Sequence, residues 1–518
     1  MNRWPKDTPG RPVGEHGSEM SGRSSWPQAL ATARQEQNNG RLDEASRRLA
    51  GAVSDPAAPE EAVKLLASLL RAQQRHDEAV LPLRELARRR PDSSIAEHNL
   101  AAALGDAGDA PESEQAARRA IAKGGSAPET RLVLGRALVM QGRLEEAEAS
   151  FRAALSIRPD FLPAYRDLAQ LLWMQHGDPE RLSLLLEPLA AQASRNEAAA
   201  LLLSSILRDT AGDEAALASL QTWTDRPSVE LALASAAAAS GVSPQLALSY
   251  AEQARMLGGT DPRVRTAWLS ALIASGRADE AVQGLEEHLG HDPQDQYARA
   301  LLATAWRQIK DVRALTSDDY QHRVRAYRIG PEDEAERAAW LVRTAKALRR
   351  LHPFRSHPFQ QSVRDGAQSI IDPRMAGDPD IDRLFEFLKA PIDAYVREVR
   401  PDWLGEPACP PWRIAGAWSV KLAAGGRHTD HVHARAWVSS AVYIETPPAV
   451  EGQGRGGWLR FGAAQIGECF ALPAEHWVKP EPGSVVLFPS GFWHGTEPFD
   501  GLGERLTVAF DLLPKEGF

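Results

Sequence analysis

The stretch Gly40-Arg-Leu-Asp-Glu-Ala45 returns three more times in this 518-residue chain. Its copies read Arg75-His-Asp-Glu-Ala79, Gly142-Arg-Leu-Glu-Glu-Ala147 and Gly276-Arg-Ala-Asp-Glu-Ala281. The closing alanines of the first three copies lie 34 and then 68 residues apart, and Ser113 stands midway through the longer gap. A fixed period of this length, kept across several copies, indicates an array of small helical repeats.

Weaker copies follow near Gly177, Gly212 and Gly241. The glycine closes the turn between two helices, and the small residue lets the helices approach closely. The pattern resembles the tetratricopeptide repeat, and we expect about eight repeats between residues 27 and 296, within a repeat domain over 26–310. The resemblance implies an α-solenoid, a curved superhelix whose concave face holds a protein or peptide segment.

The bulk composition narrows the class of protein. A net charge of −9 argues against general nucleic-acid binding, which needs a basic surface. Cys409 and Cys469 are the chain's two cysteines, too few for a disulfide framework, and they suit a reducing compartment. No stretch supplies ~18 consecutive apolar residues, so we expect no membrane segment and a cytoplasmic location. Residues 1–25 are rich in Gly, Pro, Ser and charge, and are expected to form a disordered leader.

Beyond the repeats, residues 311–411 are predicted to form a largely helical connector that begins the next domain. Helices are expected over residues 331–351 and 380–399. From Trp412 onward, short β-rich runs alternate with Gly and Pro turns, which predicts an all-β module over 412–518. The expected strands cover residues 414–422, 437–445, 457–461, 484–488 and 505–513.

A histidine cluster lies inside the β module, in His428-Thr-Asp430-His431-Val-His433. Residues two apart on an extended strand share a face, so His431 can join His433, and His428 can join Asp430. His494 closes a later β run, and Arg505 and Thr507 follow on one face of the last run.

Such a set suits an iron(II) oxygenase. The metal needs three protein ligands on one side and open positions for a keto acid and O2. A dicarboxylate cosubstrate also needs a fixed cation and a hydroxyl, which Arg505 and Thr507 can supply. Three histidines would also suit Zn(II) in a hydrolase, but the Arg505-x-Thr507 pair favours a dicarboxylate.

Three stretches resemble the 2-oxoglutarate/Fe(II) oxygenase family that is often fused to tetratricopeptide repeats. They are His431 to Tyr443, Pro482 to His494, and the strand that begins at Arg505. The resemblance implies a double-stranded β-helix (jelly-roll) fold and the use of Fe(II), 2-oxoglutarate and O2. It also implies that Tyr443 helps Arg505 and Thr507 to hold the cosubstrate.

An upstream element, Gln361-Ser-Val-Arg-Asp-Gly-Ala-Gln368, resembles a further family motif. Its residues Gln361, Arg364 and Gln368 are candidates for the substrate mouth, or alternatively cap a helix.

Two ligand sets remain open in the sequence. The sequence motifs around them favour His431, His433 and His494 as the metal ligands. The rival set uses His428 and Asp430, because related hydroxylases carry H-x-D about 13 residues before the tyrosine, here Tyr443, and iron sites favour a carboxylate.

These features predict a multidomain α + β chain that hydroxylates a protein or peptide side chain docked by the repeats. Two other functions stay open. One is an interaction scaffold with a catalytically silent β domain. The other is a small-molecule oxygenase that uses the repeats for assembly.

Overall fold

The computed structural model describes residues 25–399 and 411–515. The chain divides after Ser126 into two compact units, which we treat separately. The predicted disordered leader, apart from Ser25, lies outside the described residues. No helix in the described ranges is both long and apolar enough to cross a membrane.

The first unit consists of helices packed in consecutive pairs. They are α1 (Trp26–Asn38), α2 (Leu42–Leu49), α3 (Glu60–Ala72), α4 (His76–Arg89), α5 (Ser94–Asp106) and α6 (Ala110–Ala122). The repeated small residues lie inside these pairs, because Ala45, Ala79 and Ser113 are fully buried. Ser113, which replaces the alanine of its neighbours, donates its hydroxyl to the backbone oxygen of Ala101 at 2.8 Å.

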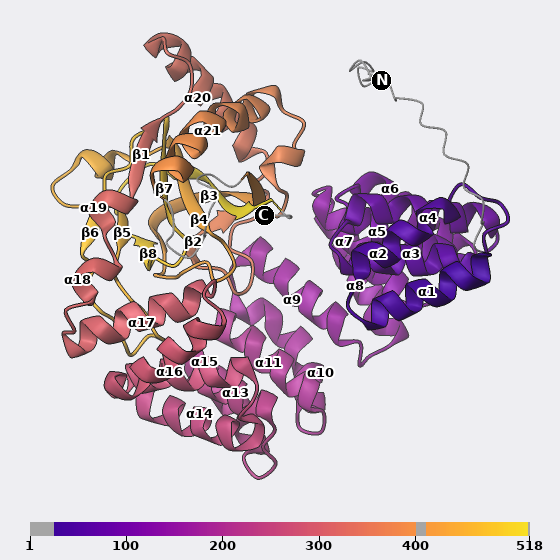
Figure 1. The fold of residues 1–518 in the computed structure, drawn as a ribbon, viewed down its shortest axis with the longest axis horizontal. Helices are drawn as coiled ribbons and strands as arrows, with labels where there is room; N and C mark the ends of the chain where they lie inside the picture. The colour runs from indigo at the N-terminus through magenta and orange to yellow at the C-terminus, as the bar shows by residue number, and fades with distance from the viewer. Residues whose placement is uncertain (1–24, 400–410, 516–518) are drawn as a thin grey trace. The chain divides into compact units, whose positions relative to one another are not determined.

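The second unit continues the same pattern with the repeat helices α7 to α17 (Figure 1). They are α7 (Pro128–Met140), α8 (Leu144–Ile157), α9 (Leu162–His176), α10 (Ser183–Ala193), α11 (Glu197–Thr210), α12 (Asp213–Leu220), α13 (Val229–Ala239), α14 (Pro244–Gly258), α15 (Pro262–Ala274), α16 (Ala278–His291) and α17 (Gln296–Ile309). The turn glycines Gly142 and Gly276 have φ values of +71° and +86°, which favour glycine. The helix α17 follows the last pair as a single helix.

Two antiparallel sheets follow, and we call residues 325–515 the β domain. The larger sheet has the strand order β1-β7-β4-β9-β3-β2, and the smaller one has the order β6-β5-β8. The strands are β1 (Arg325–Arg328), β2 (Val363–Gln368), β3 (Trp412–His428), β4 (Val438–Glu445), β5 (Leu459–Phe461), β6 (His476–Val478), β7 (Ser484–Pro489), β8 (His494–Thr496) and β9 (Arg505–Pro514).

The larger sheet begins earlier in the chain than the sequence predicted. The predicted connector supplies β1 and β2, which form the two edges of the larger sheet. The short strands β6 and β8 were not expected either. Each of these four strands has three to six residues, too few to show a clear alternation of apolar and polar side chains.

The larger sheet has two differently covered faces. On one face, α20 (Glu334–Arg349) and α21 (Pro379–Glu398) bury Trp340 and Leu388 with strand residues such as Val508 and Phe510. On the other face, side chains of β4 and β7 form one apolar cluster with β5, including Phe461 and Phe488. The prediction of a multidomain α + β chain, with helical repeats followed by a β module, is confirmed, and the strands of that module pair in an antiparallel manner.

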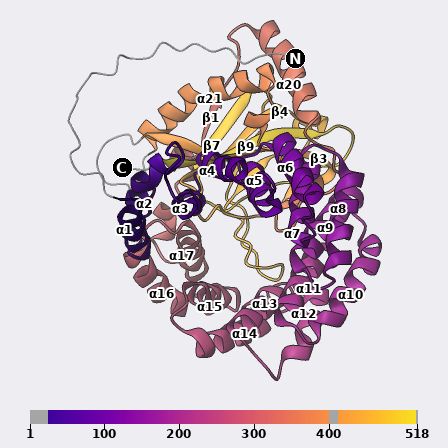
Figure 2. The same cartoon turned by 90° about the vertical axis from the view of Figure 1, so that its right-hand side faces the viewer.

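Repeat helices of the second unit pack against the β domain. The backbone oxygen of Met174 in α9 accepts hydrogen bonds from the nitrogens of Arg355 (2.9 Å) and Ser356 (3.0 Å). In the last helix of the array, α17, the Thr304 hydroxyl accepts a hydrogen bond from the Trp493 indole at 3.0 Å. Figure 2 shows the helices α9 to α17 curving around loops of the β domain. These repeats therefore hold part of their own chain on the inner side of the curve.

Candidate metal centre and its cavity

Three histidines come together where the two sheets meet. His431 and His433 lie in the loop that follows β3, and His494 begins β8. The backbones of His431 and His494 form an isolated bridge, with both N–H···O=C bonds at 3.0 Å. The side chains of the three residues thus meet although 61 residues separate His433 from His494 along the chain.

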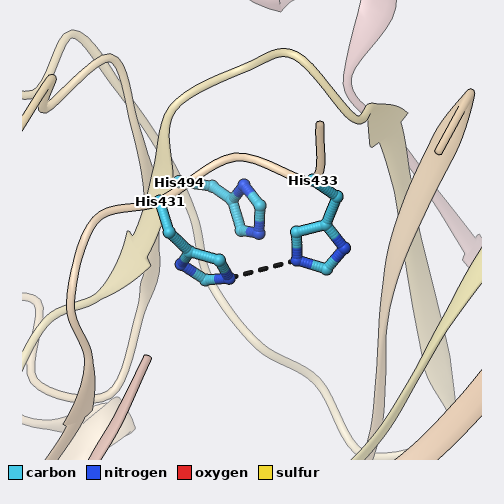
Figure 3. A group of neighbouring side chains, drawn as sticks. All are labelled: His431, His433 and His494. Atoms are coloured by element: carbon cyan, nitrogen blue, oxygen red, sulfur yellow. Dashed lines mark hydrogen bonds between the residues drawn. The ribbon is translucent and has the colours of Figure 1, made fainter. Parts of the chain in front are cut away.

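The three imidazoles face a common point (Figure 3), and one nitrogen of each lies within 4.8 Å of the others. The Nδ1 atom of each ring is directed at an oxygen instead. His431 Nδ1 is 2.8 Å from the backbone oxygen of Thr429, and His494 Nδ1 is 2.9 Å from that of Phe492. A backbone oxygen only accepts, so Nδ1 carries the proton in both rings, and Nε2 keeps its lone pair.

His433 is oriented by a carboxylate. Its Nδ1 atom lies 2.7 and 2.8 Å from the two carboxylate oxygens of Asp511 on β9. Ser439 also donates its hydroxyl to this carboxylate at 2.7 Å. A histidine ligand that donates its other nitrogen to a carboxylate has a fixed ring orientation and a more basic free nitrogen.

The distance between two of the free nitrogens fits a bound cation. The Nε2 atoms of His431 and His433 are 3.1 Å apart. With Nδ1 protonated in both rings, neither Nε2 has a hydrogen to share, so their lone pairs repel. Imidazole nitrogens lie about 2.1 Å from a first-row metal ion, so two ligands near a right angle are separated by about 3.0 Å. The donor set therefore fits a divalent transition metal.

Burial keeps the rings of His431 and His494 in the neutral form that a metal requires. Desolvation lowers the pKa of His431 to about 3, and the neighbouring His433 adds to the shift. Burial and the charge of His431 likewise hold the pKa of His494 well below its usual range.

The residues of the rival ligand set are separated in the structure. The Asp430 carboxylate forms an ion pair with Arg460, in which Arg460 Nε donates at 3.0 Å. The His428 Nδ1 atom lies 2.9 Å from the Ser362 hydroxyl, and its ring stacks on His431 with centroids 5.9 Å apart. The described residues that gather around one point thus include His431, His433 and His494 but not Asp430.

Arg505 supplies a buried cation near the triad. Its side chain is 2% exposed and lines the same cavity as the three histidines. It forms no ion pair in the described parts of the chain, and its Nε atom has no hydrogen-bond partner there. The adjacent acid, Glu504, pairs with Arg349 and Lys421 instead. An unpaired buried guanidinium is costly, so this position fits an anionic ligand.

The other two predicted cosubstrate residues lie beside Arg505. The Tyr443 hydroxyl is fully buried and accepts a hydrogen bond from Arg505 Nη2 at 3.4 Å. Thr507 is also buried and donates its hydroxyl to the Val420 backbone oxygen at 3.4 Å. A residue that the sequence reasoning missed is Thr496 of β8, which lines the cavity with a buried hydroxyl that has no partner in the described residues.

A cavity of about 980 Å³ joins the histidine triad, Arg505 and Thr496, whereas Tyr443 and Thr507 are not part of its lining. Its lining includes the three histidines, Arg505 and all three predicted mouth residues, which are Gln361, Arg364 and Gln368. Gln361 precedes β2, and Arg364 and Gln368 lie on it, so none of the three caps a helix. Asp511, Thr496 and Ser362 were not anticipated, although Asp511 could have been found by counting in twos along β9 from Arg505.

Comparison with known families agrees with this geometry. Residues 416–511 match the family model described as "Putative 2OG-Fe(II) oxygenase". Residues 30–94 and 98–160 match a tetratricopeptide-repeat model. The chain combines tetratricopeptide repeats with a 2OG-Fe(II) oxygenase-family domain. The oxygenase-family match covers the histidine triad, Arg505 and Asp511, and ends inside β9.

Solved structures resemble the repeats. A tetratricopeptide repeat protein from Parabacteroides merdae ATCC 43184 is 14% identical, covering 47% of this chain and 97% of that one, with a TM-score of 0.33. PilW, a type IV pilus biogenesis factor, is 18% identical over 46% and 97%, with a TM-score of 0.29. MamA from Desulfovibrio magneticus RS-1 is 14% identical over 35% and 93%, with a TM-score of 0.27. Comparison with curated proteins gave no significant match.

Proposed function

We propose that this protein is an Fe(II)- and 2-oxoglutarate-dependent dioxygenase that hydroxylates a side chain of a protein or peptide. One observation carries the proposal. The three converging Nε2 atoms share a cavity with a buried arginine whose Nε atom has no partner among the described residues. A metal site and a carboxylate site within one cavity suit a keto acid that must reach both.

In the proposed reaction, 2-oxoglutarate, O2 and a substrate C–H bond give succinate, CO2 and a substrate C–OH bond. Bound Fe(II) would supply the redox chemistry that couples these two oxidations. His431, His433 and His494 would hold the ion through Nε2 and leave positions open for the other reactants. The side chain of Arg505 would bind the far carboxylate of 2-oxoglutarate, with Thr496 and Tyr443 as neighbouring hydroxyls.

The residues around the triad keep the ligands in place. Asp511 and the backbone oxygens of Thr429 and Phe492 hold the three Nδ1 protons, so no ring needs to change tautomer when metal binds. The buried Arg505 gives a fixed binding direction to the cosubstrate. Arg505 also favours this reaction over hydrolysis at Zn(II), which needs no dicarboxylate.

The tetratricopeptide repeats would bring the substrate to the oxygenase domain. Repeats of this family form extended binding surfaces for protein segments. Tethering a docking surface to a catalytic domain raises the effective concentration of a bound segment at the active site.

Anaerobic addition of Fe(II) and 2-oxoglutarate to the full chain tests the proposal. We expect a weak visible charge-transfer band, which His494→Ala abolishes. His433→Ala should also abolish iron binding, whereas Asp430→Ala leaves it largely intact, because Asp430 binds Arg460. Arg505→Gln should retain iron and weaken 2-oxoglutarate binding by roughly 10- to 100-fold, because a charge-assisted hydrogen bond is lost.

A folded protein that gives no band would contradict the proposal and favour the interaction scaffold. Loss of iron binding in Asp430→Ala with retention in His433→Ala would restore the H-x-D ligand set. Circular dichroism of each variant, compared with the unchanged protein, shows whether a lost band reflects lost ligands or lost folding.

A further inference from the structure

The cavity over the histidine triad has two walls of different origin. Its floor belongs to the oxygenase domain, where His494, Thr496 and Arg505 are buried. Its opposite wall belongs to the tetratricopeptide repeats. The repeat residues that line it are Leu201, Ser204, Ser205, Arg208 and Asp209 of α11, Gly212 and Asp213 at the start of α12, and Ala234 and Ala237 of α13.

The repeat wall is fixed to the oxygenase domain by specific hydrogen bonds. The Gln360 backbone nitrogen donates to Asp209 Oδ1 at 3.1 Å. The Gln360 side-chain amide donates to the Ser205 hydroxyl at 3.2 Å. Nearby, the Cys469 thiol lies 3.1 Å from the Gly241 backbone oxygen, so the loop after β5 also contacts the end of α13. The wall is thus part of the active-site cavity rather than a separate docking surface.

The cavity deepens from an exposed rim to a buried floor. Gly212 and Glu468 at the rim are exposed, whereas His494 is 6% exposed. Cavities that bind drug-sized ligands occupy roughly 300–1,000 Å³. A volume of about 980 Å³ therefore exceeds the need of a compact dicarboxylate, and leaves room for a second reactant that extends from the floor to the rim.

Charges near the floor are balanced within the protein or by the proposed cosubstrate. Asp430 pairs with Arg460. Arg505 is assigned to the carboxylate of 2-oxoglutarate under the proposed function. The floor therefore presents no free charge to the second reactant.

Charges near the rim leave an excess of one carboxylate, because the lining holds Asp209, Asp213 and Glu468 against two arginines. Arg208 donates to Asp213 at 2.9 Å. Arg364 Nη1 donates to the backbone oxygens of Gln361 (2.6 Å) and Val363 (2.8 Å), and its positive charge offsets part of the field of Asp209 and Glu468. Asp209 accepts a hydrogen bond from a backbone nitrogen, and neither Asp209 nor Glu468 forms an ion pair within the described residues.

The two repeat-wall carboxylates are also poorly solvated. Burial raises the pKa of both Asp209 and Asp213, and nearby arginines offset that rise only in part. A cation that enters the cavity would stabilise their charged forms.

We propose that the repeat wall determines specificity by binding a peptide with a lysine or arginine next to the residue that is oxidised. The proposal rests on the proposed function, since the oxidised residue is the one that reaches the triad. Asp209 is the principal contact for the basic side chain, and Glu468 adds to the negative field. The occupant is an extended segment, because it must reach from the exposed rim at Glu468 to the buried floor.

Fluorescence anisotropy with two pools of labelled 11-residue peptides tests the proposal on the full-length, metal-free chain. Both pools are degenerate, but one fixes lysine at the two positions flanking the centre, and the other fixes glutamate. We expect the lysine pool to bind at least about tenfold more tightly. Asp209→Asn should reduce that preference by about tenfold, because one charge-assisted contact is lost. Glu214→Gln, an exposed acid on α12 outside the cavity lining, is the matched control and should change little.

A second variant tests whether the peptides bind inside the cavity. Ala237→Trp fills space at the repeat wall and should abolish binding of the lysine pool. Equal binding of the two pools, an equal loss in Glu214→Gln, or undiminished binding in Ala237→Trp would each overturn the proposal.

The charge-transfer band separates this inference from the proposed function. Asp209→Asn and Ala237→Trp should keep the Fe(II) and 2-oxoglutarate band, because neither residue touches the triad. If the band is absent from the unchanged protein but the lysine preference depends on Asp209, the dioxygenase proposal fails while the charge-selective wall stands. If the band is present and the preference is absent, the wall proposal alone fails.

Discussion

Repeats on either side of Ser126 share one sequence pattern but differ in the contacts that the structure describes for each unit. In the first unit, consecutive helices from α1 to α6 pack on one another. In the second unit, α9, α11 and α17 also donate or accept hydrogen bonds with the oxygenase domain. The repeat motif thus determines how two helices pair, while the residues between its fixed positions determine what the array contacts.

The largest expected difference between the two units concerns their tryptophans. Trp493 is buried against α17, donates to Thr304, and lies edge-on to Tyr297 with ring centroids 6.2 Å apart. Trp493→Ala should cost about 3–5 kcal/mol and weaken Fe(II) binding, since His494 is the next residue. Trp26→Ala in the first unit removes one half-buried contact to Asp55 and should cost about 1 kcal/mol without affecting iron.

Hydrogen–deuterium exchange of α15 to α17, together with Fe(II) titration, measures this difference. Equal protection and equal iron affinity in the two tryptophan variants would show that the oxygenase domain does not depend on its contact with the repeats.

A smaller difference is expected between two glycines of positive φ. Gly467 has φ +71°, and a Cβ atom there would lie 2.3 Å from the Ser240 backbone oxygen at the end of α13. Gly40 has φ +75° and no atom near its Cβ position. Both alanine variants incur strain of about 1–2 kcal/mol, but Gly467→Ala must also displace the loop and should cost about 1 kcal/mol more.

Thermal unfolding and exchange protection of residues 462–475 report this effect. A melting temperature lowered equally by the two alanine variants would mean that the loop does not press on the repeats.

The smallest expected effect is a loss of folding stability at acid pH. His357 is buried in the second unit with its ring 5.8 Å from that of Trp173, and burial lowers its pKa to about 4. The unfolded chain therefore takes up the proton first, so stability is full above pH ~6.5 and is lost as the pH falls towards ~4. Between pH 7 and 5.5, His357 should account for about 1 kcal/mol of lost stability.

His357→Phe removes this titration while keeping an aromatic ring beside Trp173. Urea unfolding at the two pH values should show a pH-dependent loss that is about 1 kcal/mol smaller in the variant. An unchanged loss would place the acid sensitivity elsewhere, for example at the buried His352, whose pKa burial also lowers to about 4.

The features recovered from the sequence are those with a repeated or local signal. The 34-residue period marked the helix pairs, and the confirmed α + β organisation followed from it and from the long β-rich runs. The edge strands β1 and β2 gave no such signal, because they contain Arg, Asp, Gly and Gln beside few apolar residues. Their position in the sheet depends on pairing with β7 and β3, and these partner strands come next to them only when the chain folds.

The residues of the site likewise fall into those that a local sequence pattern indicated and those that it did not. Short spacing suggested that His431 and His433 act together, and the structure brings His494 to them. Nothing local indicated that Asp430 turns to Arg460, or that Asp209 reaches Gln360, 151 residues away. Such pairs depend on the curvature of the whole array. The ligand set and the cytoplasmic location stay predictions.

Attachment of two helices of the second unit's array, α9 and α17, to one domain has a consequence for how this protein can evolve. Arrays of repeats commonly gain or lose a repeat without harm, because each repeat contacts only its neighbours. Here Met174 of α9 and Thr304 of α17 are both anchored to residues 355–493. Duplication of a repeat between these anchors would leave the two anchored helices unable to reach the same domain. The number of repeats between α9 and α17 is therefore fixed by the need to contact that domain at both positions.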